Sequence, residues 1–385
     1  MALLTRFVAT RPPYAVSQTH SLEWLARAHA CAEASIEGLD DADREAFGDR
    51  LARLIRRAGC SPDSIARRAS VLPDFTACES DGAEPNALYD DPRTDGSHGA
   101  YPHGRSAAVR NELFARAVER YFAHEYAGER DAPDDLIHVT CTGYVSPSGA
   151  QKLVAARGWG ARTRVTHAYH MGCYAALPAV RIAAGFVASG SERVDIVHTE
   201  LCSLHLDPSD HRLEQLVVQS LFADGLIRYA MTASDDGPGL LPLSACEIVL
   251  PDSADAMSWV GSEWGMQMTL ARDVPERIAA ELRGFVLELY RRAGLELDAL
   301  KRSVLAVHPG GPRIIDRVRE VLELAPAQVE TSREVLLDHG NMSSATLPHI
   351  WMRLLADPRV PRGTLIPSLA FGPGLTVAGT LLEKR

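Results

Sequence analysis

Short apolar runs alternate with longer helix-like segments along the chain from about residue 106 onward. Runs at 136–141, 164–169 and 194–201 combine aliphatic, β-branched and aromatic residues, and each lies between stretches of helical periodicity. Strands of a parallel sheet read as near-continuous apolar runs, because helices cover both faces of the sheet. The alternation therefore predicts an α/β fold with buried parallel strands.

The N-terminal part of the chain shows helical periodicity with clear end signals. A strand followed by an amphipathic helix is expected within residues 1–40, and a second helix over 41–58, where Gly59 is a natural stop. From 78 to 105 the sequence is rich in Gly, Pro, Asp and Asn, which predicts a long surface loop. Such loops are often functional, and a simple insertion is the alternative.

Charge and composition exclude several classes of protein. The 385 residues carry a net charge of −10, which argues against a nucleic-acid partner because phosphate binding needs a basic face. The most apolar helical stretch, 175–188, is interrupted by Pro178 and Arg181 and is too short to span a membrane. The N-terminus lacks a secretory signal pattern, so a cytoplasmic protein is predicted. Seven cysteines without a CxxC pair favour reduced thiols over disulfides or a zinc site.

Three short motifs, far apart in the chain, supply one nucleophile and two hydrogen-bond donors. They read YHMGCYAAL around Cys173, AVHPGGP around His308 and HGNMSSA around Asn341. Each follows a strand-like run and precedes a helix-like segment, so each side chain is expected at a strand-to-helix turn. A thiol can accept an acyl group, while an imidazole and a carboxamide can stabilise negative charge on oxygen. Any one of them alone is more often a core or turn residue.

Together with QSLFADG at 219–225 and AFGPGLTV at 370–377, these motifs resemble the chalcone synthase-like family, the type III polyketide synthases of the thiolase superfamily. The resemblance runs from about residue 40 to the C-terminus, and HPGGP and GNMSSA are its most specific elements. It implies a thiolase-like five-layered αβαβα sandwich built from two similar halves, 1–240 and 241–385. The first half would carry the nucleophile Cys173, and the second would carry His308 and Asn341.

The resemblance also implies an activity. The expected activity is that of an acyltransferase and ketosynthase of secondary metabolism. Such an enzyme joins acyl and malonyl-type thioesters by Claisen condensation in polyketide biosynthesis. The resemblance further implies a homodimer without a bound cofactor or metal. One alternative is a stand-alone ketosynthase that joins two carrier-protein-bound β-ketoacyl chains into an α-pyrone. Another is a thiolase-fold acyltransferase, thioesterase or scaffold that does not condense. The helix after Cys173 is expected to favour the thiolate.

Substrate-binding residues follow from the resemblance by position. Phe222 matches an aromatic gatekeeper, and Met268 matches a second gatekeeper that is usually phenylalanine. Because methionine is flexible, a gate with Met268 is expected to admit longer acyl chains. Cys202 and His205 fall where the family shapes its cavity, and Ser343 belongs to the GNMSSA motif. Packing under a loop is the alternative for Cys202 and His205, and the HLDPSDH segment that follows is predicted to be a polar turn rather than a metal site.

The chain departs from the family where coenzyme A phosphates are usually held by basic side chains. Those positions read Ile55, Ala58 and Pro62. Nearby arginines could grip coenzyme A or form a basic rim for an acidic acyl carrier protein: Arg56, Arg57, Arg67 and Arg68. A methionine that usually reaches into the partner subunit's cavity is Ser146 in this sequence.

Overall fold

The computed structural model describes residues 2–76, 88–89, 101–233 and 237–385. Most of the loop predicted at 78–105 therefore lies outside the described residues. The first two helices match the prediction closely. Helix α1 (Gln18–Glu37) is capped at its N-terminus by Ser17, whose side chain accepts a hydrogen bond from the His20 N–H. A left-handed Gly38 caps its C-terminus. Helix α2 (Asp41–Ala58) has the predicted bounds and is capped by Asp40.

A nine-stranded sheet organises the molecule, with strand order β11-β12-β13-β8-β1-β7-β6-β4-β5. The predicted strands are present as β4 (Asp135–Thr140), β5 (Arg164–Tyr169) and β6 (Arg193–Leu201), and β4 is parallel to both of the others. The other strands are β1 (Leu3–Thr10), β7 (Asp224–Thr232), β8 (Leu240–Val249), β11 (Ala306–Val307), β12 (Leu365–Gly372) and β13 (Thr376–Lys384).

The prediction of a parallel sheet is correct for only part of it. Strands β4, β5 and β6 are parallel, and so are β11 and β12, but the pairs from β6 through β7, β1, β8 and β13 to β12 are antiparallel. Two small antiparallel sheets of two strands each pair β2 (Tyr14–Ser17) with β3 (Arg67–Ser70) and β9 (Met257–Gly261) with β10 (Met266–Leu270). A hydrophobic run indicates that a strand is buried but not whether its partner is parallel or antiparallel, which explains why the prediction is correct for only part of the sheet.

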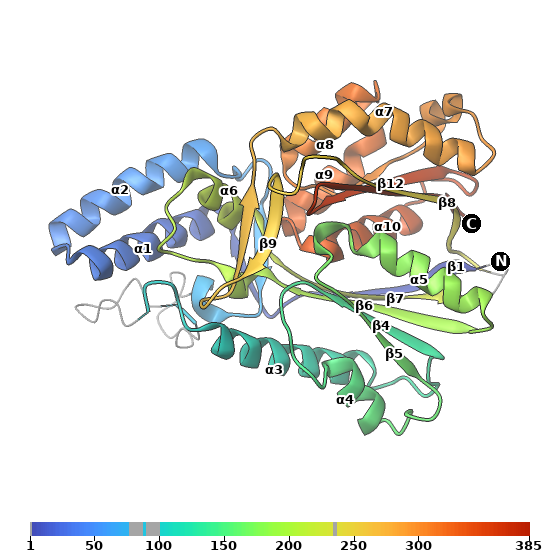
Figure 1. The fold of residues 1–385 in the computed structure, drawn as a ribbon, viewed down its shortest axis with the longest axis horizontal. Coiled ribbons are helices and arrows are strands. Elements are labelled where there is room, and N and C mark those ends of the chain that lie inside the picture. Colours follow the sequence, from blue (N-terminus) through green and yellow to red (C-terminus); the bar gives the residue numbers. More distant parts are fainter. Residues whose placement is uncertain (1, 77–87, 90–100, 234–236) are drawn as a thin grey trace.

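Helices and sheet form five layers (Figure 1). Helices α7 (Val274–Arg292) and α8 (Pro312–Val321) pack with β12 and β13 on one outer side. Helices α5 (Ala176–Ala188) and α10 (Thr346–Ala356) form the middle layer and bury their side chains against both parts of the sheet. Helices α3 (Ala107–Glu125) and α4 (Gly149–Ala156) cover β4 and β6 on the other outer side. The predicted thiolase-like αβαβα sandwich is confirmed.

The two proposed halves meet inside this sheet. Residues 1–240 supply β1 and β4 to β7, while the segment after residue 240 supplies most of β8 and all of β11 to β13. The seam is the β1–β8 pairing, with Leu4 opposite Leu240. The division of the chain near residue 240 stays a prediction. No helix in the described part of the chain is both long and apolar enough to cross a membrane.

Candidate active site

Cys173 lies in a single 3-10 turn (Gly172–Tyr174) between β5 and α5, so the predicted strand-to-helix turn is confirmed for this residue. The turn requires glycine before the cysteine. Gly172 has φ +76°, and a Cβ at this position would lie 2.7 Å from Cδ of Pro373. The turn thus holds the thiol in a buried position against the loop between β12 and β13.

His308 directly follows β11 and precedes α8, which also agrees with the predicted turn. Its backbone N–H donates to the carbonyl of Leu369 at 2.8 Å, which fixes the end of β11 beside β12. The ring is buried, and within the described residues neither ring nitrogen has a hydrogen-bond partner. Burial lowers the pKa of His308 to about 3, so the imidazole is neutral. Buried polar atoms are rarely left without partners, so this ring is available to a substrate.

Asn341 corrects the prediction, because it follows helix α9 (Glu330–His339) and not a strand. Its backbone N–H donates to Leu221 O at 3.0 Å, and its carbonyl accepts from Ala223 N–H at 2.8 Å. The residue therefore pairs as an isolated bridge with Phe222, just after helix α6 (Leu213–Leu221). Its Oδ1 accepts from the Ser343 N–H at 2.8 Å, which orients the carboxamide.

The three predicted catalytic side chains line one cavity of about 670 Å³. Cys173, His308 and Asn341 come from three segments that are far apart in the sequence, and the fold brings them to the same space. Four exposed arginines also line this cavity: Arg56, Arg57, Arg272 and Arg313. The cavity thus joins a basic surface to a buried thiol.

A second, smaller cavity of about 50 Å³ lies on the other side of the nucleophile. Cys173, Phe222 and Met268 line both cavities, so the two predicted gatekeepers stand where the spaces meet. The predicted residues Cys202, His205 and Ser343 line only the inner cavity.

His205 shapes the inner cavity without offering a free ring nitrogen. Its Nδ1 accepts from the Met266 N–H at 3.1 Å, and its Nε2–H donates to Thr142 O at 2.8 Å. Burial lowers the pKa of His205 to about 3, so the ring is a neutral wall residue.

Burial dominates the electrostatics of the thiol. It raises the pKa of Cys173 to about 12, and hydrogen bonds from Ser343 and Asn341 only partly offset it, while the nearby Glu200 charge acts in the same direction as burial. The prediction that the helix end makes Cys173 a thiolate is therefore wrong for Cys173 acting without a proton acceptor. Neither Cys173 nor His308 ionises by itself. Passing a proton from the thiol to the imidazole leaves the site without net charge, which avoids the cost of a lone buried charge.

Sequence reasoning missed a second thiol and a carboxylate at this site. The Sγ of Cys141 lies 3.2 Å from Ser343 Oγ, and the Sγ of Cys173 lies 3.9 Å from the same oxygen. Glu200 is buried beside Cys141, whose backbone N–H donates to it at 3.1 Å. Cys141 follows β4, and Cys173 follows the neighbouring parallel strand β5. Because the carboxyl ends of parallel strands meet at one edge, this signal was present in the sequence.

The basic residues near α2 divide into two groups. Arg56 and Arg57 are exposed and line the large cavity. Arg68 is wrong as a rim residue, because it is buried and its Nη1 donates to the carbonyls of Gln219 and Phe222 at 2.7 and 2.8 Å. It fixes the C-terminal end of α6. Arg67 is exposed on β3 and is not among the residues lining either cavity.

The remaining predictions about this region concern a metal and the partner subunit. In the described ranges, no group of three or more His, Cys, Asp or Glu is placed to hold a metal ion. Ser146 is exposed.

Comparison with known proteins places this chain in a family. The family model of the chalcone and stilbene synthase N-terminal domain matches residues 112–235, and that of the C-terminal domain matches residues 242–384. Type III polyketide synthase C of Arabidopsis thaliana is 32% identical over 258 residues, which are 65% of this chain and 67% of the relative. Type III polyketide synthase A of the same plant is 30% identical over 266 residues, 65% of this chain and 66% of the relative.

Solved structures share the fold over almost the whole chain. The C-terminal type III polyketide synthase domain of Steely1, a type I/III hybrid from Dictyostelium, superposes with a TM-score of 0.79 at 23% identity and covers 99% of both chains. For 1,3,6,8-tetrahydroxynaphthalene synthase from Streptomyces coelicolor the TM-score is 0.78 at 23% identity, covering 100% of this chain and 99% of that one.

The fold is that of the thiolase-like type III polyketide synthase structures. More narrowly, the chain belongs to the chalcone and stilbene synthase family of type III polyketide synthases, the condensing enzymes of polyketide biosynthesis.

Proposed function

We propose that the enzyme extends acyl thioesters by decarboxylative Claisen condensation, with Cys173 as the acyl carrier and His308 and Asn341 as donors to substrate oxygens. The observation that carries the proposal is the single cavity shared by these three side chains, where both His308 ring nitrogens are left without a protein partner in the described residues. Two neutral donors in the cavity of one nucleophile can stabilise the enolate that decarboxylation of an extender leaves.

The first step is acylation of the thiol. Cys173 Sγ attacks the carbonyl carbon of an acyl thioester as its proton passes to neutral His308. The tetrahedral intermediate then expels the carrier thiolate, which takes the proton and leaves as a free thiol. One thioester is broken and one is formed on Cys173. Because burial makes a lone thiolate costly, His308 supplies the base in the same step.

The second step forms the carbon–carbon bond. A malonyl-type thioester enters the same cavity and loses carbon dioxide, which leaves an enolate. The enolate oxygen accepts hydrogen bonds from the N–H groups of His308 and Asn341. Its carbon attacks the acyl carbonyl on Cys173, and the released thiolate takes up a proton. The chain grows by two carbons. Two preorganised donors suit this step, and loss of one such donor typically costs about 10² to 10³ in rate.

The route of delivery follows from the arginines. We propose that the phosphate-bearing arm of the thioester enters through the cavity of about 670 Å³, past Arg56, Arg57, Arg272 and Arg313. The positions at Ile55, Ala58 and Pro62 cannot pair with phosphate. The same rim could receive coenzyme A or the acidic surface of an acyl carrier protein. We further propose a cytoplasmic homodimer that needs no bound cofactor.

A mass measurement tests the acyl carrier. Intact-protein mass spectrometry after brief incubation with an acyl thioester should show one acyl adduct in the wild type and none in Cys173→Ala. Cys141→Ala and Cys202→Ala are matched controls from the inner cavity, which Cys173 also lines, and should still carry the adduct. An adduct that persists in Cys173→Ala and disappears in Cys141→Ala would move the nucleophile to the other thiol.

A further inference from the structure

The last carbonyls of helix α6 take their hydrogen bonds from other parts of the chain, because the end of a helix offers them no partner. Arg68 Nη1 donates to the carbonyls of Gln219 and Phe222, at 2.7 and 2.8 Å. The carbonyl of Ser220, which lies between these two residues in sequence, accepts from Gln18 Nε2 at 2.7 Å. Two buried side chains from the N-terminal part of the chain thus hold the end of α6 in place.

Asn341 is bonded through its backbone to the α6 end, the turn formed by residues 219–223. The Asn341 N–H donates to the Leu221 carbonyl at 3.0 Å, and the Asn341 carbonyl accepts from the Ala223 N–H at 2.8 Å. The side-chain Oδ1 accepts from the Ser343 N–H at 2.8 Å, which leaves the Nδ2 protons as the donors of the carboxamide. The direction of these donors therefore depends on where the α6 end lies.

The aliphatic part of Arg68 also lies beside the residue that precedes Asn341. Gly340 has φ +74°, and a Cβ at this position would lie 3.2 Å from Arg68 Cγ and 3.0 Å from the Leu221 carbonyl oxygen. Glycine permits both the left-handed backbone and this close approach. Arg68 therefore acts on the Asn341 segment in two ways, through the hydrogen bonds of the α6 end and through packing next to Gly340.

The guanidinium of Arg68 is itself fixed by two other elements. Arg68 lies on β3, where it pairs with Val16 of β2, and its Nη2 donates to the Ser21 hydroxyl in the first turn of α1. A guanidinium is planar, and its N–H groups point in fixed directions, so it can hold two carbonyls in one geometry. The ammonium of a lysine has no such fork. Arg68 thus fixes the α6 end relative to β3 and α1.

We propose that Arg68 is a positioning residue for Asn341. It fixes the α6 end, and the α6 end in turn directs the Nδ2 protons of Asn341 toward the enolate oxygen. This role rests on the condensing function proposed above, in which Asn341 donates to the enolate and Cys173 carries the acyl group. A change at Arg68 should therefore slow decarboxylation of the extender and leave acylation of Cys173 almost unchanged.

Arg68→Lys is the first test, because it keeps the buried charge and removes the fork. Carbon dioxide release from a malonyl-type thioester should fall by about tenfold to a hundredfold, less than the 10² to 10³ that loss of a whole donor typically costs. The acyl adduct on Cys173, read by mass spectrometry, should form at close to the wild-type rate. Arg68→Met removes the charge as well. Wild-type decarboxylation in Arg68→Lys, with or without a loss in Arg68→Met, would overturn the proposal.

A double-mutant cycle separates positioning of Asn341 from a general loss of stability. If Arg68 acts through Asn341, Arg68→Lys should slow decarboxylation in the otherwise wild-type enzyme and have almost no further effect in the Asn341→Ala background. Losses that multiply in the double variant would mean that Arg68 acts by another route and would contradict the proposal. If Asn341→Ala alone releases carbon dioxide at the wild-type rate, the proposed function fails, and the position of the carboxamide still tests Arg68.

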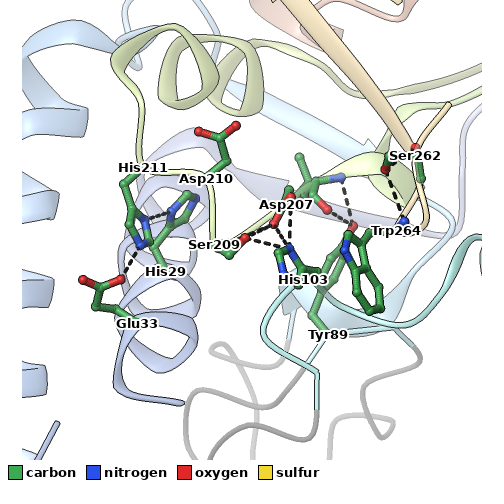
Figure 2. A network of polar contacts seen from close by, with 12 residues as sticks. His29, Glu33, Tyr89, His103, Asp207, Ser209, Asp210, His211, Ser262 and Trp264 are labelled. Carbon is green, nitrogen blue, oxygen red and sulfur yellow. Dashed lines mark hydrogen bonds and ion pairs between the residues drawn. The ribbon is translucent and has the colours of Figure 1, made fainter. Parts of the chain in front are cut away.

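Arg110 offers a matched control, because it is also a buried arginine that donates to backbone carbonyls. Its Nε donates to the Arg105 carbonyl at 2.8 Å and its Nη1 to the Leu206 carbonyl at 3.1 Å. Leu206 lies in the segment before α6, beside Tyr89 and Asp207 in the network that Figure 2 shows. Neither carbonyl pairs with the segment around residue 341. Any effect of Arg110→Lys on decarboxylation should therefore be equally large with and without the Asn341→Ala change.

The carboxamide can also be observed without turnover. The chain contains three asparagines, Asn86, Asn111 and Asn341, so selective isotope labelling gives a simple NMR spectrum of side-chain amides. The Asn341 signal is the one that disappears in Asn341→Ala. In Arg68→Lys this signal should shift, because the α6 end moves, whereas in Arg110→Lys it should stay in place. An unshifted Asn341 signal in Arg68→Lys would exclude the positioning role, even in an enzyme that forms no condensation product.

Discussion

At the scale of single residues, the site combines two groups that burial keeps neutral. The Cys173 pKa is raised to about 12, and the His308 pKa is lowered to about 3. A thiolate formed alone would thus be rare at neutral pH, and the proton has to move to a neighbour for the thiol to react. In the mechanism proposed above, that neighbour is His308.

This coupling predicts how the thiol reacts with a small neutral electrophile. In His308→Ala, Cys173 keeps the raised pKa of a buried thiol, so the alkylation rate should climb about tenfold per pH unit from about pH 7 to 9. The wild type should be faster at neutral pH and its profile flatter, because His308 accepts the proton. Rates are read by mass spectrometry of the alkylated protein, with Cys173→Ala as the blank. Superimposable profiles would contradict the proposed pair.

A second prediction separates acylation from decarboxylation. Asn341→Ala should still form the Cys173 adduct, but carbon dioxide release from a malonyl-type thioester should fall by about 10² to 10³, the usual effect of removing one oxyanion donor. Asn341→Asp tests charge against shape, since a carboxylate would repel the enolate. The comparison uses labelled extender and counts released carbon dioxide. Decarboxylation at the wild-type rate in Asn341→Ala would remove Asn341 from this step.

At the scale of elements, the predicted gate lies where a helix end meets a hairpin. Phe222 caps α6, whose last turn is fixed by Arg68, and Met268 lies on β10 of the β9–β10 hairpin. Gln215 of α6 donates to the Met268 carbonyl. The gate position is thus set by a buried arginine and a glutamine outside the motifs that predicted it.

The gate yields a prediction about substrate length. Met268→Phe replaces a flexible side chain by a rigid ring, so turnover of a long acyl thioester should fall by about tenfold while that of a short one changes little. Val260→Phe, on the neighbouring strand and 59% exposed, is the matched control and should leave both substrates unaffected. kcat/KM for the two thioesters gives the answer. Equal losses for long and short chains in Met268→Phe would exclude a gating role.

At the scale of the whole molecule, four arginines line the larger cavity of an otherwise acidic protein, and we propose that the thioester enters past them. If a carrier protein delivers the acyl group, kcat/KM should be higher for the carrier-bound form than for coenzyme A, and the preference should weaken with salt. Charge reversal at Arg272 or Arg313 should reduce the preference for the carrier-bound form about as much as salt does. Arg67→Glu, outside the cavity lining, should leave that preference unchanged. Better use of free acyl-coenzyme A would assign the rim to its phosphates.

Local patterns made much of this molecule predictable. Helix α2 and strands β4 to β6 follow from periodicity and caps, and the three motifs named residues that share one cavity. Long-range pairing was not predictable, because no local signal says that β1 lies between β7 and β8. The helix before Asn341 looked like a strand because its apolar residues, such as Val335 and Leu336, are adjacent. The burial of Arg68 depends on carbonyls about 150 residues away.

The first and last strands in the sequence lie inside the sheet, and this position affects the order in which the protein can assemble during synthesis. Strand β1 is made first, but its partners β7 and β8 begin only at Asp224 and Leu240. Strand β13, formed by Thr376–Lys384, lies between β8 and β12 in the interior of the same sheet. The ribosome must therefore release nearly all of these residues before the sheet can be completed. Strand β1 can pair on both edges once β7 and β8 are made, but β8 exposes the edge that β13 covers until the last strand is released, and an exposed strand edge favours aggregation of a nascent chain.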